Sequence, residues 1–408
     1  MATEAEKSFF ERALGFGADW QLTGLSLDEG LKEAHITLSY IPGTYVGPDG
    51  SGYSLYDRLP SRKWQHLPIL GYRAFLHCRV PRADFGDGKP KAIPVPWATP
   101  RKGYTLLFRD HVTELLLGTY NQSATAKLAG TTPDIVGSVM KDAVDQGLAL
   151  RDAEGHGPKK LGIDEKAVGK GHQYASVLTD LEAGTVREVI KGRDKDAAKT
   201  LIDSSLTEGQ KLEVEAVALD MWPAFMDAVK EKLPNALHVH DKFHLVQYLN
   251  KAIDTVRKKE VRGEGLLKKA KYVMLKGQDN LTGAQWEHFE DIMAANLEAA
   301  RAWALAEQFK ATVPVKGQST VQATAFFDMW CDKVEEAKLK PMEKVMETFK
   351  SHLEGILNYI KQPITNAIAE RINGKIQRLK TVSRGYRNFG NLRIAILFFN
   401  GGLRLFSH

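Results

Sequence analysis

Residues 161–184, LGIDEKAVGKGHQYASVLTDLEAG, decide the fold of this chain. They have the pattern of a β-hairpin, in which an apolar first strand is followed by a polar interruption and a second strand, YASVLTD. Asp164 stands where the first strand should be most buried. An ionised carboxylate inside a strand is costly unless a metal, a cation or hydrogen bonds compensate it. The rest of the chain must therefore supply that compensation.

Downstream of the hairpin, strand and helix patterns alternate. The expected elements are strands at 160–167, 172–180 and 186–192, a helix from 195, a strand at 211–222, a helix at 222–234, and a strand running into a helix over 236–249. A strand meander followed by helix, strand, helix and strand is the order of an RNase H-like mixed sheet, although many α/β folds share parts of it.

The C-terminal half has a helical pattern. Residues 250–360 are almost wholly helical in pattern, with Trp286, Trp303 and Trp330 expected in the core. A last helix over 365–385 precedes a basic tail. The α/β unit is therefore expected to be interrupted by an all-helical insertion.

Two further acids are candidates to share a site with Asp164. Asp220 ends the apolar strand VEAVALD, and strand ends are where reactive groups collect in α/β sheets. If Asp164 and Asp220 face each other, they repel unless a divalent cation lies between them. Glu370 in the last helix is the third candidate, because cationic residues follow it. Such a triad would hold two Mg²⁺ or Mn²⁺ ions about 3.5–4 Å apart, and its oxygen ligands do not suit zinc. Turn-forming or N-capping aspartates are the simpler explanation of the two Asp residues taken alone.

The N-terminal third divides into two patterns. Up to residue 100, short strands separated by Gly/Pro clusters predict a β-rich module. Helical patterns follow at 104–118, 122–130 and 132–152, with Thr132 as N-cap and Pro133 in the first turn. This arrangement is that of a helix-turn-helix or equally of a generic three-helix bundle, and the adjacent basic module favours DNA binding.

Composition limits the classes of protein that fit. A length of 408 residues suggests two to three domains at roughly 150 residues each, and 43% hydrophobic and 26% charged residues are typical of a soluble globular protein. Cys78 and Cys331 alone provide neither a disulfide framework nor a cysteine-rich zinc site. The first 20 residues lack the pattern of a signal peptide and no apolar run approaches the roughly 18 residues of a membrane span, so a cytoplasmic protein is expected.

Charge is unevenly distributed around a net value of +6. From Arg371 to His408 there are eight Lys or Arg residues and no acid, and residues 251–278 are also rich in Lys and Arg. Each patch alone fits a solvated helix face, but several together favour nucleic acid as the partner.

Three long strings resemble a known family: 162–184, 218–260 and 369–393, with the match extending upstream through PVPWATPRKGYTLLF at 94–108. The chain resembles the DDE transposases of bacterial insertion sequences, specifically the ISL-three group. The resemblance implies an RNase H-like catalytic core interrupted by a helical insertion, and an N-terminal region that binds terminal inverted repeats. On matching positions it implies the triad Asp164, Asp220 and Glu370, which is also the set chosen from the residues.

The same resemblance suggests supporting residues and shows two departures. Asp241 and His244 match an Asp-x-x-His signature; their spacing puts them on one face of a helix turn, and a structural helix cap explains them equally well. The family's N-terminal module usually carries a zinc knuckle, but this chain has Gly47, Gly50, Phe85 and Gly88 near the positions of its cysteines. No zinc is therefore expected. The module should instead be held by packing of Tyr53, Tyr56, Trp64 and Trp97. The cation often found seven residues after the Glu is Gln377 here, so Lys375 and Arg378 are the alternatives for contacting phosphate.

Contacts with DNA are expected from basic residues of both N-terminal regions and of the tail. The third helix of the bundle is expected to present Thr131, Thr132, Asp134, Ser138 and Lys141 on its outer face. This set lacks the Arg and Asn residues that form bidentate hydrogen bonds with base edges. Base specificity is therefore expected from the β-rich module. The expected DNA-contacting residues are Arg58, Arg62, Lys63, Arg73, Arg79, Arg82, Arg101, Lys102, Lys127, Lys141, Arg384 and Arg387.

Together these observations predict a multidomain α+β/α protein. The expected parts are a β-rich DNA-binding module (1–100), a helix-turn-helix (101–152), an RNase H-like core (158–250 and 361–408) and a helical insertion (251–360). The expected function is transposition: binding of terminal inverted repeats and Mg²⁺-dependent cleavage and strand transfer by a homodimer that synapses two ends and captures target DNA, in a bacterial cytoplasm near the nucleoid. The alternatives are a transposase-derived DNA-binding protein without catalysis and an RNase H-like nuclease such as a junction resolvase, which would lack the helix-turn-helix and the insertion.

Overall fold

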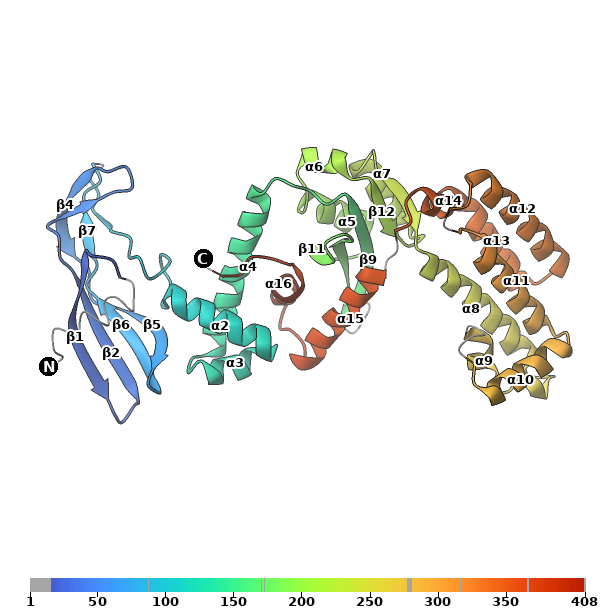
Figure 1. The fold of residues 1–408 in the computed structure, drawn as a ribbon, viewed down its shortest axis with the longest axis horizontal. Coiled ribbons are helices and arrows are strands. Elements are labelled where there is room, and N and C mark those ends of the chain that lie inside the picture. The colour runs from blue at the N-terminus through green and yellow to red at the C-terminus, as the bar shows by residue number, and fades with distance from the viewer. Residues whose placement is uncertain are drawn as a thin grey trace. The chain divides into compact units, whose positions relative to one another are not determined.

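The computed structural model describes residues 16–86, 88–169, 171, 173–276, 281–315, 317–364 and 367–406. Predictions that fall on residues 1–15, 87, 170, 172, 277–280, 316, 365–366 and 407–408 lie outside the described residues. The chain forms two compact units: one comprises 1–153, 380–385 and 403–408, and the other comprises 154–379 and 386–402 (Figure 1). No helix among the described residues is long and apolar enough to cross a membrane.

The first unit begins with two four-stranded sheets, which confirms the expected β-rich N-terminal region. One sheet has the order β1-β2-β6-β5 and the other β3-β4-β7-β8. The strands are β1 (Trp20–Asp28), β2 (Glu33–Tyr40), β3 (Thr44–Val46), β4 (Gly52–Arg58), β5 (Arg62–Ile69), β6 (Tyr72–Cys78), β7 (Pro81–Ala83) and β8 (Lys91–Ala92).

Aromatic rings form the core of this module. Trp97 packs edge-to-face against Trp64 and Trp20, with ring centroids 5.8 and 4.7 Å apart. Tyr53 and Phe85, near the places of the family's missing cysteines, pack with ring centroids 4.8 Å apart. The prediction for Tyr56 was wrong, because its side chain is 68% exposed beneath the guanidinium of Arg82.

Three helices complete the first unit in the predicted order: α2 (Leu106–Thr119), α3 (Gln122–Leu128) and α4 (Pro133–Ala153). Gly130 makes the turn between α3 and α4 with a positive φ of 61°, which favours glycine. Gln65 of β5 ties this turn to the β-module, since its Nε2 donates to the Gly130 carbonyl at 3.0 Å and its Oε1 accepts from Thr131 Oγ1 at 2.9 Å. Thr131 thus faces the protein, contrary to its expected place on an outer face.

The second unit contains a five-stranded mixed sheet of order β11-β10-β9-β12-β13. Its strands are β9 (Lys160–Gly169), β10 (Gln173–Asp180), β11 (Thr185–Lys191), β12 (Ala216–Leu219) and β13 (Leu237–His240). The first three form an antiparallel meander, and β12 runs parallel to both β9 and β13. This is the predicted RNase H-like arrangement.

Helices α5 (Lys195–Asp203) and α7 (Pro223–Lys232) pack against this sheet through a core that includes Ile163, Leu201 and Phe225. The strand expected over 211–222 is shorter than predicted. A capping box of Thr207 and Gln210 starts helix α6 (Glu208–Glu213) in its place, and only four residues before Asp220 are extended.

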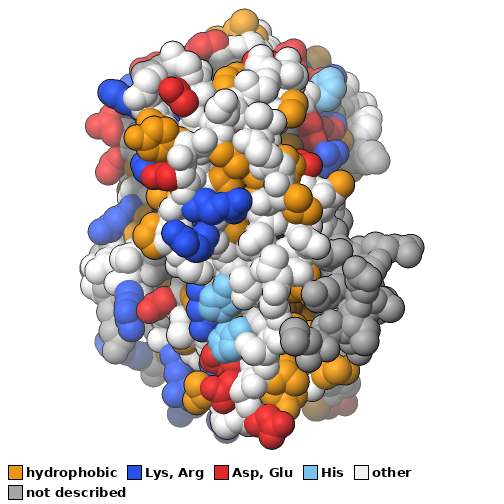
Figure 2. Space-filling model, turned by 90° about the vertical axis from the view of Figure 1, so that its left-hand side faces the viewer, with side chains coloured by type: hydrophobic (Ala, Val, Ile, Leu, Met, Phe, Trp, Pro, Cys, Tyr) orange, Lys and Arg blue, Asp and Glu red, His pale blue; other side chains and the backbone are white. Residues whose placement is uncertain are grey.

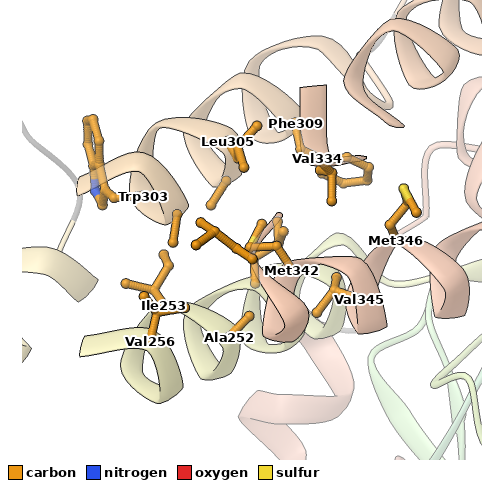
Figure 3. Close-up of a cluster of buried hydrophobic side chains, with 14 of the residues drawn as sticks. Ala252, Ile253, Val256, Trp303, Leu305, Phe309, Val334, Met342, Val345 and Met346 are labelled. Atoms are coloured by element: carbon orange, nitrogen blue, oxygen red, sulfur yellow. The ribbon is translucent and has the colours of Figure 1, made fainter. Parts of the chain in front are cut away.

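The helical insertion has its own core. It contains α8 (Lys242–Glu260), η1 (Gly265–Leu267), α9 (Lys271–Leu275), α10 (Gly283–Ala294), α11 (Glu298–Thr312), α12 (Thr320–Ala337), α13 (Lys340–Ser351) and α14 (Leu353–Lys361). Figure 3 shows apolar side chains of α8, α11, α12 and α13 converging, among them Ile253, Phe309 and Met342. Trp303 and Trp330 are buried as predicted, whereas Trp286 is 39% exposed and its indole donates to Glu290 at 2.8 Å, so its core prediction was wrong.

Two helices close the second unit: α15 (Ala367–Val382) and α16 (Phe389–Asn400). The latter packs on β11, and its residues Leu392, Ile396 and Leu397 are buried. The sequence predicts only a basic tail here. The apolar run RIAILFF is instead the core-facing side of a helix.

Candidate active site

Strand register aligns the first two candidate acids. β9 and β12 are parallel, with Ala216 opposite Lys160, Val217 opposite Leu161 and Ala218 opposite Gly162. Continuing this register by two residues places Asp220 opposite Asp164. Because side chains alternate between the two faces of a sheet, Asp164 and Asp220 point to the same face as Gly162 and Ala218. The spacing of 56 residues, uninformative in the sequence, is therefore the offset between two neighbouring strands.

Asp164 is held by hydrogen bonds, and no Lys or Arg among the described residues forms an ion pair with it. Its Oδ1 accepts from the backbone of Glu165 at 2.8 Å, and its Oδ2 accepts from Asn373 Nδ2 at 2.6 Å. Burial raises the pKa of the Asp164 carboxyl, and the charge of Asp220 adds to the rise, whereas His244 and the two hydrogen bonds oppose it. The protein's own groups therefore compensate this buried acid only in part.

Asp220 lies directly after β12, where the chain turns into α7. Its Oδ1 accepts from the backbone of Met221 at 2.7 Å. Pro223 occupies the start of α7, where a missing N–H costs no helical hydrogen bond. The acid is thus fixed at the end of a short buried strand.

Glu370 reaches the cluster from the first turn of α15. Its Oε1 is buried and has no hydrogen-bond partner among the described residues. Burial raises the pKa of the Glu370 carboxyl, and the charges of Asp241 and Asp164 raise it further, while His244 lowers it. Asn373 lies one turn along the same helix, so α15 brings both side chains toward β9.

Asp241 and His244 flank the same cluster. Asp241 is the N-cap of α8 and accepts from the backbone of Phe243 at 3.3 Å, so the capping explanation describes a real contact. His244 Nδ1 is buried and has no hydrogen-bond partner among the described residues. It lies 3.9 Å from Asp241 Oδ2. The charge of His244 lowers the pKa of both Asp164 and Glu370, so this side chain lies close to both carboxyls.

An aromatic and cationic group beside the acids was missed by sequence reasoning. The guanidinium of Arg193 lies over the rings of Tyr174 and Trp222, 4.1 and 5.3 Å from their centroids. It also forms an ion pair with Glu165 at 3.3 Å, next to Asp164 in the chain. No motif marks Arg193, because its partners lie on three separate elements.

The two expected phosphate contacts of α15 are exposed. Lys375 and Arg378 both face solvent. Helical spacing places Gln377, rather than either cation, two turns from Glu370 on the same face.

Many of the expected DNA-contacting cations are already held within the first unit. Lys63 and Arg73 pair with Glu33 at 3.7 and 2.8 Å, Arg82 pairs with Asp57, and Lys102 pairs with Asp142 at 2.6 Å. Arg58, Arg62 and Arg79 donate to backbone carbonyls. In the face that Figure 2 shows, basic side chains are interspersed with acidic ones and form no uninterrupted patch. The exposed members of the predicted set include Arg101, Lys127, Lys141, Arg384 and Arg387.

The carboxylate cluster fits a divalent cation by its chemistry but is not closed around one. Its donors are oxygens, as Mg²⁺ and Mn²⁺ prefer, and the buried Glu370 Oε1 lacks a partner among the described residues. Within the described part of the chain, no three His, Cys, Asp or Glu side chains stand in an arrangement that could hold a metal ion.

Comparisons with known proteins agree on one family. Residues 161–396 match the DDE family of ISL3 elements, described as "Transposase", and residues 93–144 match the "Helix-turn-helix domain of transposase family ISL3". The transposase for insertion sequence element IS1001 of Bordetella parapertussis is 26% identical over 338 residues, covering 80% of this chain and 81% of that protein. The transposase for element IS1557 of Mycobacterium tuberculosis is 25% identical over 378 residues, covering 84% and 82%.

A solved structure with lower similarity is the Drosophila P element transposase strand transfer complex. It has a TM-score of 0.41 and 11% sequence identity, covering 72% of this chain and 92% of that chain. A similarity of that size does not establish a shared fold.

Proposed function

The chain belongs to the ISL3 family of insertion-sequence transposases, and on that premise we propose that it binds the terminal inverted repeats of its own element, cleaves their 3′ strands and joins the new ends to target DNA. The helix-turn-helix at 93–144 supports the DNA-binding part of this proposal. Two ends must be synapsed, each with an active site, so the working form is a homodimer.

One observation carries the catalytic part of the proposal. The register of β9 and β12 aligns Asp164 with Asp220, and the pKa of Glu370 responds to the charge of Asp164. The charge of Asp164 thus interacts with the charges of both Asp220 and Glu370, although these acids are up to 206 positions apart in the chain and like charges normally avoid such proximity. This costly arrangement is typical of a catalytic site.

Asp164, Asp220 and Glu370 would hold divalent cations, Mg²⁺ or Mn²⁺. Two such ions supply activation of water or a 3′-hydroxyl and stabilisation of the leaving oxygen in phosphodiester displacement. The protein's own contribution is positioning. Asn373 fixes the orientation of Asp164 through its hydrogen bond, and Asp241 fixes the start of α8, from which His244 faces Asp164 and Glu370.

The test is cleavage of a duplex that carries the element's own terminal repeat and its flanking DNA. Asp220→Asn should lower the Mg²⁺-dependent cleavage rate by at least about 10³-fold, equivalent to about 4 kcal/mol of transition-state stabilisation, while binding of the end is unchanged. Asp227→Asn is the matched control, since Asp227 is an exposed residue of α7, and it should cleave like the wild type.

Two results would contradict the proposal in different ways. Equal cleavage by Asp220→Asn and the wild type would place catalysis elsewhere. Tight binding by the wild type without cleavage in Mg²⁺ or Mn²⁺ would favour the alternative of a transposase-derived DNA-binding protein.

A further inference from the structure

The charge of the helical insertion is strongly polarised. Residues 251–276 carry nine Lys or Arg residues and three acids, whereas residues 281–360 carry eight Lys or Arg residues and twelve acids. The basic part comprises the second half of α8, η1 and α9. The charge is therefore divided along the chain, with a positive first segment and a negative remainder, and α10 (Gly283–Ala294), which packs on α9 and η1, carries three of the acids.

Two of the three acids in the basic part are engaged inside the protein. Asp254 pairs with the buried Arg257 at 2.7 Å and with Lys258 at 2.8 Å. Glu260 accepts hydrogen bonds from the backbone of Glu298 and Ala299, both at 2.9 Å, at the start of α11. These acids therefore leave most of the surface cations uncompensated.

Four residues of this region line an open cavity of about 380 Å³: Thr255, Lys258, Lys259 and Arg262. Helical spacing puts Thr255, Lys258 and Lys259 on one side of the last turns of α8, and Arg262 follows two residues after the end of the helix. Lys259 and Arg262 are exposed, and neither has an ion-pair partner among the described residues. The ammonium and guanidinium groups of this set match the donors that contact phosphate oxygens, whereas the Thr255 hydroxyl already donates to the Lys251 carbonyl at 2.7 Å.

Stabilisation of the helix dipole explains only part of this charge. Cations in the last turn of a helix interact favourably with its carbonyl end, which accounts for Lys258 and Lys259. Five more cations lie beyond the end of α8 and are all exposed: Arg262, Lys268, Lys269, Lys271 and Lys276. An external polyanion explains these additional charges.

We propose that the α8–α9 basic surface, defined as Thr255, Lys258, Lys259, Arg262, Lys268, Lys269, Lys271 and Lys276, contacts the sugar–phosphate backbone of duplex DNA during transposition. This inference rests on the proposed function and gives the helical insertion a role in it. Backbone contacts of this kind add affinity without sequence information.

Helix α8 fixes the distance between this surface and the candidate active site. The helix begins at the Asp241 cap beside the carboxylates and ends at Glu260 (Figure 1). Its 19 residues span about 28 Å at 1.5 Å per residue. That length corresponds to about 8 base pairs of DNA at 3.4 Å each. The surface should therefore contact phosphates about 8 base pairs from the scissile one.

The first experiment measures the salt dependence of DNA binding by the full-length protein. DNA binding is measured on a 40-base-pair duplex that carries the terminal repeat and its flank. In the variant Lys259→Gln/Arg262→Gln, the plot of log affinity against log salt concentration should be less steep, with a slope smaller in magnitude by about 2. The control Lys333→Gln/Lys344→Gln removes the same charge from exposed positions of α12 and α13 and should leave the slope unchanged. Equal slopes for the two variants would overturn the proposal.

The second experiment identifies which DNA lies on the surface. An iron–EDTA cleavage reagent is attached at Arg262→Cys, and attachment is selective because Cys78 and Cys331 are both buried. Cuts in the terminal duplex about 8 base pairs from the scissile phosphate would assign the surface to the DNA being cleaved. Cuts in a target duplex added in trans would assign it to target DNA. Absence of cuts in either duplex would overturn the proposal.

Neither measurement requires catalysis by the protein. Wild type that binds but does not cleave would contradict the proposed function while leaving the salt slope and the footprint interpretable. Normal cleavage by the wild type, with equal slopes for the two double variants, would contradict only the role of the α8–α9 basic surface.

Discussion

Two acids of the same sheet are buried in opposite ways. Glu188 of β11 is 3% exposed, and both of its carboxylate oxygens accept from the guanidinium of Arg393 on α16. Asp164 of β9 is separated from it only by β10, yet its charged neighbours include Asp220 and Glu370, and no Lys or Arg of the described residues pairs with it. Arg393 of the C-terminal helix thus neutralises the charge of Glu188, whereas Asp164 lies near two further acids.

The difference separates structural from functional charge. A buried carboxylate whose counter-charge is supplied by the fold stabilises one arrangement of elements, here the docking of α16 on β11. A buried carboxylate surrounded by other acids lowers stability in the apo protein and leaves capacity for an external cation. Removing charge should therefore have opposite effects on the two sites.

The largest expected loss of stability follows from breaking the ion pair between Glu188 and Arg393. Arg393→Met leaves Glu188 buried without its partner and should lower the stability of the β11–α16 region by about 3 kcal/mol. Hydrogen exchange of the β11 amides in the full-length protein measures this loss. Arg387→Met, an exposed change in the same C-terminal segment, should not alter that exchange.

The double variant Glu188→Gln/Arg393→Met tests the cause of this effect. It removes both charges and should recover most of the lost protection. Equal exchange in the single and double variants would mean that packing of the arginine stem, rather than the ion pair, holds α16 on the sheet.

A smaller effect is expected from Asn373 at the unbalanced site. Asn373→Ala removes the only side-chain hydrogen bond found on Asp164 among the described residues, and should slow Mg²⁺-dependent cleavage by about 10–100-fold. Because Asn373 acts through Asp164, the apparent affinity for Mg²⁺ should fall together with the rate. The control Arg371→Gln changes an exposed residue on the side of the same helix opposite Asn373, and similar losses of rate and apparent Mg²⁺ affinity in both variants would point to damage to α15 instead.

Much of the fold was predictable because its patterns are local. The meander, the order of the sheet and the three helices of the first unit follow from alternation, caps and turns near each element. Strand β1 and helix α16 were missed for different reasons. WQLTGLSLD alternates apolar and polar residues on either side of Gly24, but a β-bulge between Leu22 and Gly24 interrupts the alternation. The run RIAILFF carries no local strand or helix signal of its own, and its burial depends on β11, roughly 200 positions earlier in the chain.

The candidate site was predictable in its acids but not in their surroundings. Asp164 and Asp220 stand out because each ends or interrupts an apolar strand, and Glu370 was selected by the basic residues after it. Asn373 lies three residues from Glu370, so helical periodicity could have indicated it. Arg193 could not have been found in this way, because Tyr174, Trp222 and Glu165 reach it from distant parts of the sequence.

The smallest predicted effect has the opposite sign to that of Arg393→Met. With metals removed by EDTA at pH 7, Asp164→Asn should raise the stability of the second unit by about 1 kcal/mol. The carboxyl pKa of Asp164 is higher in the folded protein than in the unfolded chain, so its favourable contribution is complete at low pH and is lost as pH rises through the folded pKa. The wild type should therefore lose stability over that rise relative to the variant.

Geometry permits this substitution at little cost. In the wild type, Asn373 Nδ2 donates to Asp164, and Asn373 Oδ1 has no hydrogen-bond partner among the described residues. A flip of the Asn373 amide would turn this oxygen toward the side-chain amide introduced by Asp164→Asn, and the oxygen could then accept a hydrogen bond from it. Thermal unfolding at several pH values measures the difference, and Asp227→Asn is the control without a change. Added Mg²⁺ should reverse the order, because only the wild type gains stability from binding the ion. A variant less stable than the wild type at every pH without metal would show that Asp164, like Glu188, is balanced by the fold.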